Sequence, residues 1–204
     1  SAQIEKDFSS MTVNAIDRTI LNFSSFDIAA NQTVTFNLPS ADSRILNRVV
    51  GGTASSIEGK LNSNGRVFLV NEAGIYIGSN ANINVNSLIL STRDITNSNF
   101  LNGDYLFERT SSGQDRLLIN QGDITLESAG FGVLIGGAVK NQGVIAASCG
   151  NVVLAGADAV RVSFQGNGVI SVALEKETAQ TVTDYQGNAL ASQVENTGSI
   201  YAPG

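Results

Sequence analysis

Histidine and tryptophan are absent from this sequence of 204 residues, which also has only two prolines, one cysteine and 15% charged residues. The lack of histidine removes the commonest general base and the commonest metal ligand of proteins. The single cysteine, Cys149, has no partner for an internal disulfide. Its apolar surroundings predict a buried and inert thiol.

Positive charge is scarce as well. The net charge is −6 and no run of Lys or Arg occurs, so a nucleic-acid partner is not expected. No window approaches the roughly 20 apolar residues of a membrane-spanning helix. The chain starts SAQIEK, without a basic and apolar leader. We therefore expect either a cytosolic protein or one whose signal peptide has been removed.

The sequence is instead rich in Gly, Asn, Ser and Thr between short apolar runs, and 42% of its residues are apolar. This composition is typical of an all-β protein with many turns. A repeat narrows the class further. When residues 117–138 are placed over 138–159, Asn120 and Gly122 fall on Asn141 and Gly143, a shift of 21 residues, and the pattern Asn-x-Gly-x-Ile returns at Asn196 and Gly198.

A unit of about 20 residues with two or three short strands cannot bury its own apolar face, and stacking such units can. The fold predicted is therefore all-β, a right-handed parallel β-helix with about 20 residues per rung. We expect the repeated asparagines to form a ladder at a corner in the left-handed conformation, and the glycines to supply positive φ. A β-sandwich would also use short strands, but it predicts hairpins rather than a repeat.

We expect one domain over residues 1–204, and the segments that break the repeat divide it. Residues 1–45 are predicted as an N-terminal β cap over the open end of the coil, and 46–95 as the first rungs. Residues 96–116 would form an extra-helical hairpin turning at Asn102-Gly103. Residues 117–172 would be regular rungs, 173–194 a second hairpin excursion, and 195–204 the start of a further rung of a longer protein.

Five motifs keep their order and spacing over roughly residues 10–160: aromatic residues Phe23 and Phe26, then Ile45-Leu46-Asn47-Arg48-Val49, Ser56-Ile57-x-Gly59-x-Leu61, Asn64-Gly65-x-Val67-Phe68-Leu69 and Ser91-Thr92-x-Asp94-Ile95. With them the chain resembles the N-terminal two-partner secretion (TPS) domain of filamentous-haemagglutinin-like exoproteins, and their adhesin-like branch in particular. The family signature Asn-Pro-Asn-Gly-Ile aligns with Asn71-Glu72-Ala73-Gly74-Ile75, so its proline and second asparagine are absent.

The resemblance implies a secretion domain of a large exported adhesin-type protein. Such a domain is recognised in the periplasm by the POTRA domains of an outer-membrane β-barrel transporter of the TpsB type, and it nucleates β-helix folding outside the cell. The resemblance makes Asn47, Arg48, Asn71, Gly74 and Ile75 candidates for recognition by the transporter. Asn120, Gly122, Asn141, Gly143, Asn196 and Gly198 are expected to be structural. The expected protein is a secreted or surface-bound monomer that uses no cofactor and no metal.

Two other functions remain open. β-Helices also carry polysaccharide lyases and hydrolases, which need clustered carboxylates. The densest charges here, Glu108-Arg109, Asp115-Arg116 and Glu175-Lys176-Glu177, are expected on a solvated surface, so no catalytic residue is predicted. The segment could alternatively be an adhesive surface, with host or matrix glycans bound through the full-length protein.

Overall fold

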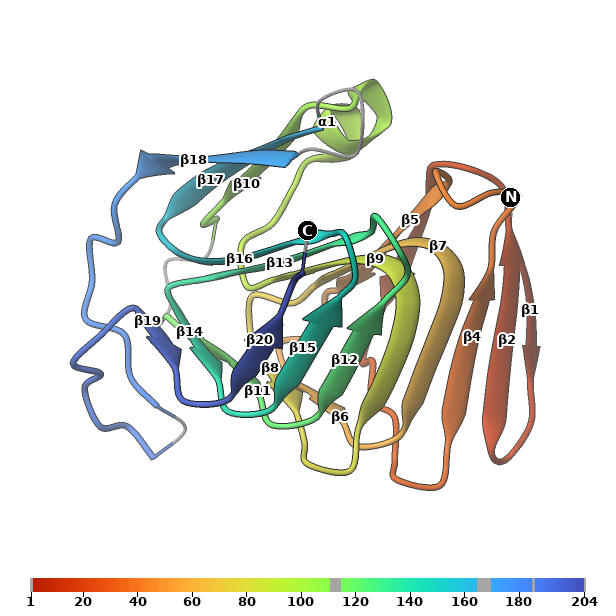
Figure 1. Cartoon of the computed structure of the whole chain (residues 1–204), viewed down its shortest axis with the longest axis horizontal. Coiled ribbons are helices and arrows are strands. Elements are labelled where there is room, and N and C mark those ends of the chain that lie inside the picture. The colour runs from red at the N-terminus through yellow and green to blue at the C-terminus, as the bar shows by residue number, and fades with distance from the viewer. Residues whose placement is uncertain (1, 111–114, 165–169, 185, 204) are drawn as a thin grey trace.

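The computed structural model describes residues 2–110, 115–164, 170–184 and 186–203, and these form an almost entirely β structure. In Figure 1 the strands lie side by side as successive turns of a coil, from β1 at one end to β20 at the other. Nearly all neighbouring strands of the coil pair in parallel, and only β1 and β2 pair antiparallel. The predicted parallel β-helix is confirmed.

Each full turn of the coil has three walls. The first wall contains β2 (Ser10–Ala15), β4 (Thr33–Asn37), β12 (Asp123–Leu126), β15 (Val144–Ala147) and β20 (Ser199–Tyr201). The second contains β3 (Thr19–Phe23), β5 (Arg44–Val49), β13 (Phe131–Gly136) and β16 (Asn151–Gly156). The long strands β7 (Lys60–Val70) and β9 (Asn82–Ser91) extend over both of these walls.

The third wall is a sheet of five short strands: β6 (Ser55–Ile57), β8 (Ile75–Ile77), β11 (Leu117–Asn120), β14 (Ala138–Asn141) and β19 (Val194–Asn196). Equivalent residues of the sequence repeat are paired across neighbouring strands of these walls. Asn120 pairs with Asn141 across β11 and β14, and Val133 pairs with Val153 across β13 and β16. The period of the sequence therefore corresponds to one turn of the coil.

Inward side chains from the three walls stack into an inner core, in which Val13, Phe36, Leu61, Ile83 and Ile145 are almost fully buried. Along β4 and β7 the inward residues alternate with outward polar ones, as the two-residue period of a strand requires. Burial of this apolar column supplies the main driving force for folding.

The N-terminal region differs from the prediction of a cap over residues 1–45. Only β1 (Ala2–Lys6), which pairs antiparallel with β2, closes the end of the coil. From β2 onward the strands already form parallel turns, with β2 on β4 and β3 on β5. The repeat is invisible there because the inward positions hold different apolar residues, such as Val13, Val34 and Phe36, which serve the core equally well.

The first excursion is not the hairpin that Asn102-Gly103 predicted. Residues Asn97–Asn102 form helix α1, which Thr96 caps by accepting a hydrogen bond from the Asn99 backbone N–H. Gly103, with φ of 78°, ends the helix in the left-handed conformation, a common role of glycine. An Asn-Gly pair marks positive φ, which a helix end needs as much as a hairpin does.

The run of regular turns is interrupted after β16 rather than continuing to residue 172, and β19 and β20 resume it. Strands β17 (Ala159–Phe164) and β18 (Ile170–Lys176) leave the coil as an antiparallel pair, and β10 (Tyr105–Glu108) joins them in a sheet of order β10-β17-β18. This extra-helical sheet covers the second wall, as Figure 1 shows. Its residues Tyr105, Phe107, Val160 and Val162 form a second core with outward side chains of that wall, such as Phe68.

Three local expectations were wrong: the conformation of the ladder asparagines, that of the neighbouring glycines, and the burial of Cys149. The ladder asparagines are strand residues, and none of them has positive φ. Gly122, Gly143 and Gly198 are likewise absent from the glycines with positive φ. Gly143 is required because a Cβ there would lie 2.1 Å from the backbone oxygen of Gly122 in the adjacent turn. Cys149 is exposed, at a corner with φ of 52°, and not buried.

Within the described residues, no helix is long and apolar enough to cross a membrane.

Candidate functional site

Arg48 joins two of the family motifs in space. Its side chain lies on β5 and is 13% exposed, and its Nε donates to Asp94 Oδ1 at 2.8 Å. The same guanidinium donates to Asn97 Oδ1 at 2.8 Å and to the backbone oxygen of Ile95. Residues 94–97 are where the chain leaves β9 for helix α1. Arg48 therefore fixes the start of the first excursion to the early turns of the coil.

Asn47, the neighbour of Arg48, is fully buried on the same strand. Its Nδ2 donates to the backbone oxygen of Phe68 at 3.2 Å. Its Oδ1 has no partner among the described residues. The side chain of Asn47 is thus inaccessible from outside the folded coil.

Asn71, Gly74 and Ile75 form the corner between β7 and β8. Asn71 is 1% exposed, and its Nδ2 donates to the Thr53 backbone oxygen at 2.9 Å and to Ser55 Oγ at 3.0 Å. Its Oδ1 accepts from the Ala73 backbone N–H at 2.9 Å. Gly74 has φ of 117°, which disfavours residues with a side chain, and Ile75 is fully buried.

This corner differs from the ladder corner, although each has an asparagine shortly before a glycine. Asn120 pairs with Ile77 at the end of β8, whereas Asn71 stands after β7, at a different corner of the turn. The two stretches are alike in sequence because each corner contains an asparagine whose side chain bonds to the turn and a glycine close to it.

The asparagine ladder itself is present. Asn120 Nδ2 donates to Asn141 Oδ1 at 2.8 Å, and Asn141 Nδ2 donates to Asn196 Oδ1 at 2.8 Å. Asn120 and Asn141 are fully buried. Because each buried amide finds its partner in the next turn, the ladder satisfies polar groups that burial would otherwise penalise. Its role is structural.

Sequence reasoning missed Arg93, which is 1% exposed. Its Nη1 and Nη2 donate to the two carboxylate oxygens of Asp115, both at 2.7 Å. Nη2 also contacts Asp158 Oδ1 at 3.2 Å, and Nε donates to the Ala157 backbone oxygen at 2.7 Å. Asp115 was expected on a solvated surface, but it is 3% exposed. Arg93 follows β9, Asp115 precedes β11, and Asp158 precedes β17.

The buried triad of Arg93, Asp115 and Asp158 therefore joins the points where the first excursion leaves the coil, where it returns, and where the second one leaves. Arg93 is the unspecified position of the motif Ser91-Thr92-x-Asp94-Ile95, and Asp115 and Asp158 lie in none of the five motifs. The three are far apart in the sequence, and their pairing requires the fold.

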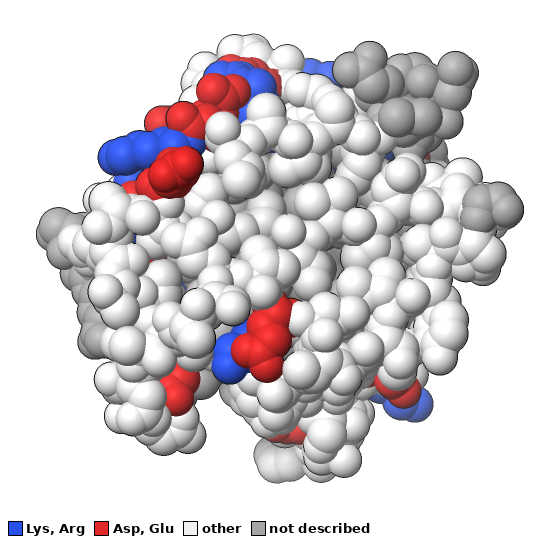
Figure 2. Space-filling model, turned by 60° about the vertical axis from the view of Figure 1, so that its left-hand side comes forward, with Lys and Arg blue, Asp and Glu red and all other residues white. Residues whose placement is uncertain are grey.

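Figure 2 shows a face that is mostly uncharged, on which the largest group of charged side chains is a stripe of mixed sign. On the extra-helical sheet, Arg161 pairs with both Glu175 and Asp104, and the hydrogen bond to Glu175 is the main cause that raises the pKa of Arg161. Among the described residues, no three of the His, Cys, Asp and Glu side chains group closely enough to hold a metal ion.

The chain is similar to known proteins in both sequence and structure. A family model described as the TPS secretion domain matches residues 3–204. The chain is 36% identical over 184 residues to a heme/hemopexin-binding protein of Haemophilus influenzae, an alignment that covers 86% of this chain and 20% of that protein. A second heme/hemopexin-binding protein of that species is 37% identical over 106 residues, covering 52% of this chain and 11% of the relative.

The structure is similar to the crystal structure of the HMW1 secretion domain from Haemophilus influenzae. The TM-score is 0.84 and the sequence identity 30%, and the match covers 99% of this chain and 51% of the solved one. The chain thus spans about a fifth of the first curated relative.

Proposed function

Because the chain belongs to the TPS secretion domain family, with a match over residues 3–204, we propose that it directs a larger protein through a TpsB-type transporter in the outer membrane. In this proposal the transporter's periplasmic POTRA domains recognise the chain after a signal peptide has taken it to the periplasm. The match over the whole chain is the observation that carries the proposal. The domain acts by being recognised and by folding, and it performs no reaction.

The burial of the candidate residues bears on when recognition occurs. Asn47 and Ile75 are fully buried and Asn71 is 1% exposed in the folded coil. A transporter that contacts these side chains must therefore do so before the coil forms. Recognition of an unfolded chain agrees with passage through a narrow pore, which the lack of any internal disulfide also permits.

Folding outside the cell would then bury the recognised residues and make transport hard to reverse. Parallel pairing between distant segments is slow to begin, and it propagates once a first turn exists. β1 pairs antiparallel with β2 and closes one end of the coil, while β2 to β9 supply parallel turns on which later strands add. We propose that this N-terminal part is the folding nucleus.

The experiment is export of the chain, fused to a signal peptide, in cells with and without its transporter. We expect the chain in the medium only when the transporter is present. A parallel binding assay would use the transporter's periplasmic domains with chain freshly diluted from urea and with chain folded beforehand. We expect tighter binding of the freshly diluted chain, and equal binding of both forms would refute recognition before folding.

The two steps can be separated with substitutions. Asn71→Ala should impair folding, since it removes three hydrogen bonds at a buried corner. Asn37→Ala removes an exposed asparagine bonded to Asn14 and serves as the matched control. If Asn71→Ala folds normally in vitro and still fails to be exported, the side chain acts in recognition. If neither folding nor export changes, it acts in neither.

The curated relatives are named for heme and hemopexin, and the chain matches 20% of the first of them. We propose that the cargo here is also an exported protein with a binding function of its own. A glycan array and a heme titration with this chain alone would test whether binding resides in the domain.

A further inference from the structure

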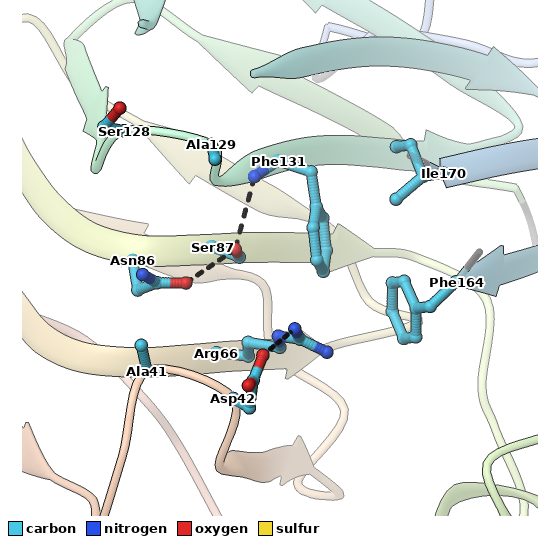
Figure 3. A pocket seen from close by; sticks show the side chains of 10 residues that line it. All are labelled: Ala41, Asp42, Arg66, Asn86, Ser87, Ser128, Ala129, Phe131, Phe164 and Ile170. Carbon is cyan, nitrogen blue, oxygen red and sulfur yellow. Dashed lines mark hydrogen bonds and ion pairs between the residues drawn. The ribbon is translucent and has the colours of Figure 1, made fainter. Parts of the chain in front are cut away.

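A cavity of about 270 Å³ lies between corner loops of the coil and the end of the extra-helical sheet. Figure 3 shows its two unlike sides, one polar and one aromatic. Asp42, Arg66 and Asn86 belong to the polar side, while Phe131, Phe164 and Ile170 form the apolar side. Neither the inner core nor the family motifs account for a cavity with this composition.

Arg66 is the central residue of the cavity. Its guanidinium carbon lies 5.6 Å from the centre of the Phe131 ring and 5.3 Å from that of Phe164, and the two ring centres are 4.8 Å apart. These are distances at which a cation is attracted by aromatic rings. Burial is the main cause that lowers the pKa of Arg66, which remains charged at neutral pH because arginine ordinarily titrates above about 12.

The guanidinium has more donors than the surroundings satisfy. Arginine carries five N–H groups. In the described part of the chain, Asp42 is the one side chain bonded to the guanidinium, and it accepts from Nη2 alone. Nε of Arg66 is buried and has no partner there. Nη1 also has no acceptor there and, unlike Nε, is not fully buried, so it is open to an incoming acceptor.

Asp42 is a weak competitor for such an acceptor. Its side chain is 83% exposed, against 18% for Arg66, so it can turn into water when another anion arrives. A carboxylate that accepts two parallel hydrogen bonds from arginine binds more strongly than one held by a single nitrogen. One arginine beside an acidic neighbour suits an anion of single charge and disfavours a phosphate or sulfate dianion.

We propose that this cavity binds a small organic acid with one carboxylate on a single apolar ring. The carboxylate would take two hydrogen bonds from Arg66, and the ring would pack against Phe164 and Ile170, where an aromatic wall adds to burial. Polar substituents, if present, would face Asn86. The cavity volume lies just below the roughly 300 Å³ at which small-molecule sites begin. The proposal does not rest on the role in secretion, because it concerns only the folded chain.

Binding of benzoate and of cyclohexanecarboxylate to the folded chain would be followed by calorimetric titration, with benzamide as the neutral analogue. We expect dissociation constants on the order of millimolar for both acids and no saturation with benzamide. Absence of saturable binding for both acids, or equal binding of benzamide, would overturn the proposal.

Two variants locate the site. Arg66→Met should abolish binding, whereas Asp42→Asn should tighten it several-fold, since it removes the resident carboxylate from an exposed position. Arg161→Met, an arginine that pairs with two carboxylates outside the cavity, is the matched control and should bind as the parent does. If Arg66→Met does not fold, Asp42→Asn decides the matter. Unchanged affinity in Asp42→Asn would place the acids elsewhere and refute the site.

Discussion

Replacement of Arg93 by methionine should lower the free energy of unfolding strongly while changing the side-chain volume little. In Arg93→Met the apolar part of the side chain remains, but Asp115 and Asp158, which are 3% and 4% exposed, lose the cation between them. Removing one partner of a buried ion pair costs about 3–5 kcal/mol, because the remaining charge is left buried. Domains have a free energy of unfolding of roughly 5–15 kcal/mol, so the loss is a large fraction of the total.

The assay is equilibrium unfolding in urea, followed by circular dichroism. With a denaturant dependence of about 2–3 kcal/mol per molar, the midpoint of Arg93→Met should fall by roughly 1–2.5 M. Arg161→Met is the matched control, since Arg161 also stands between two carboxylates but on the surface. Its midpoint should hardly change, because exposed ion pairs contribute little.

A triple variant tests the cause. Arg93→Met combined with Asp115→Asn and Asp158→Asn removes all three charges and keeps the side-chain volumes. We expect it to recover a substantial part of the lost stability, since the penalty comes from uncompensated charge and not from lost packing. The reasoning is refuted if Arg93→Met costs less than about 1 kcal/mol, or if the triple variant is no more stable than the single one.

Three further predictions concern the coil and its closed end. Gly143→Ala should lower the melting temperature far more than Gly52→Ala. A Cβ at Gly143 would lie 2.1 Å from a backbone oxygen, whereas one at Gly52 meets nothing within 4 Å and costs only about 1–2 kcal/mol for its positive φ. Similar melting temperatures of the two variants would contradict the close approach at Gly143. Asn141→Ala should cost about 1–3 kcal/mol for each ladder group left unpaired, measured by urea unfolding, whereas Asn37→Ala, in an exposed asparagine pair, should be nearly neutral. The pKa of Asp7 is lowered chiefly by the hydrogen bond from the Ser9 backbone N–H. The stabilisation of the β1–β2 turn by Asp7 should therefore be complete above about pH 4 and be lost as pH falls through the lowered pKa. Amide exchange that is equally slow in β1 of Asp7→Asn and of the parent at neutral pH would rule this out.

Much of the fold could be predicted because a coil repeats its own requirements. Asn120, Asn141 and Asn196 recur at the same corner, and the shift between them is the register of the strands. A residue that must pair with its own copy one turn away leaves a period in the sequence. The N-terminal turns escaped notice because an inward position only needs an apolar side chain, and Val13 and Phe36 meet that need without repeating.

The candidate sites show the opposite case. Motif analysis selected Asn47, Arg48 and Asn71, but could not tell a buried structural role from an exposed one. Asn47 is fully buried, whereas the Arg48 side chain is 13% exposed and bonds to Asp94. Adjacent strand residues face opposite sides, so one step along the chain separates the two roles. Whether either is read by a transporter is a question for the export assay.

The sequence by itself determined the parallel coil, its period, its asparagine ladder and its family, since each depends on residues that recur or keep a fixed spacing. The tertiary structure alone decided what lies against the coil. It brought Arg93 to Asp115 and Asp158, closed the extra-helical sheet over Phe68, and set Arg66 against Phe131 and Phe164. These contacts join segments of different sequence, and each contact occurs once in the fold. Pairings of this kind leave no period to read, because they arise only when the folded coil places their partners together.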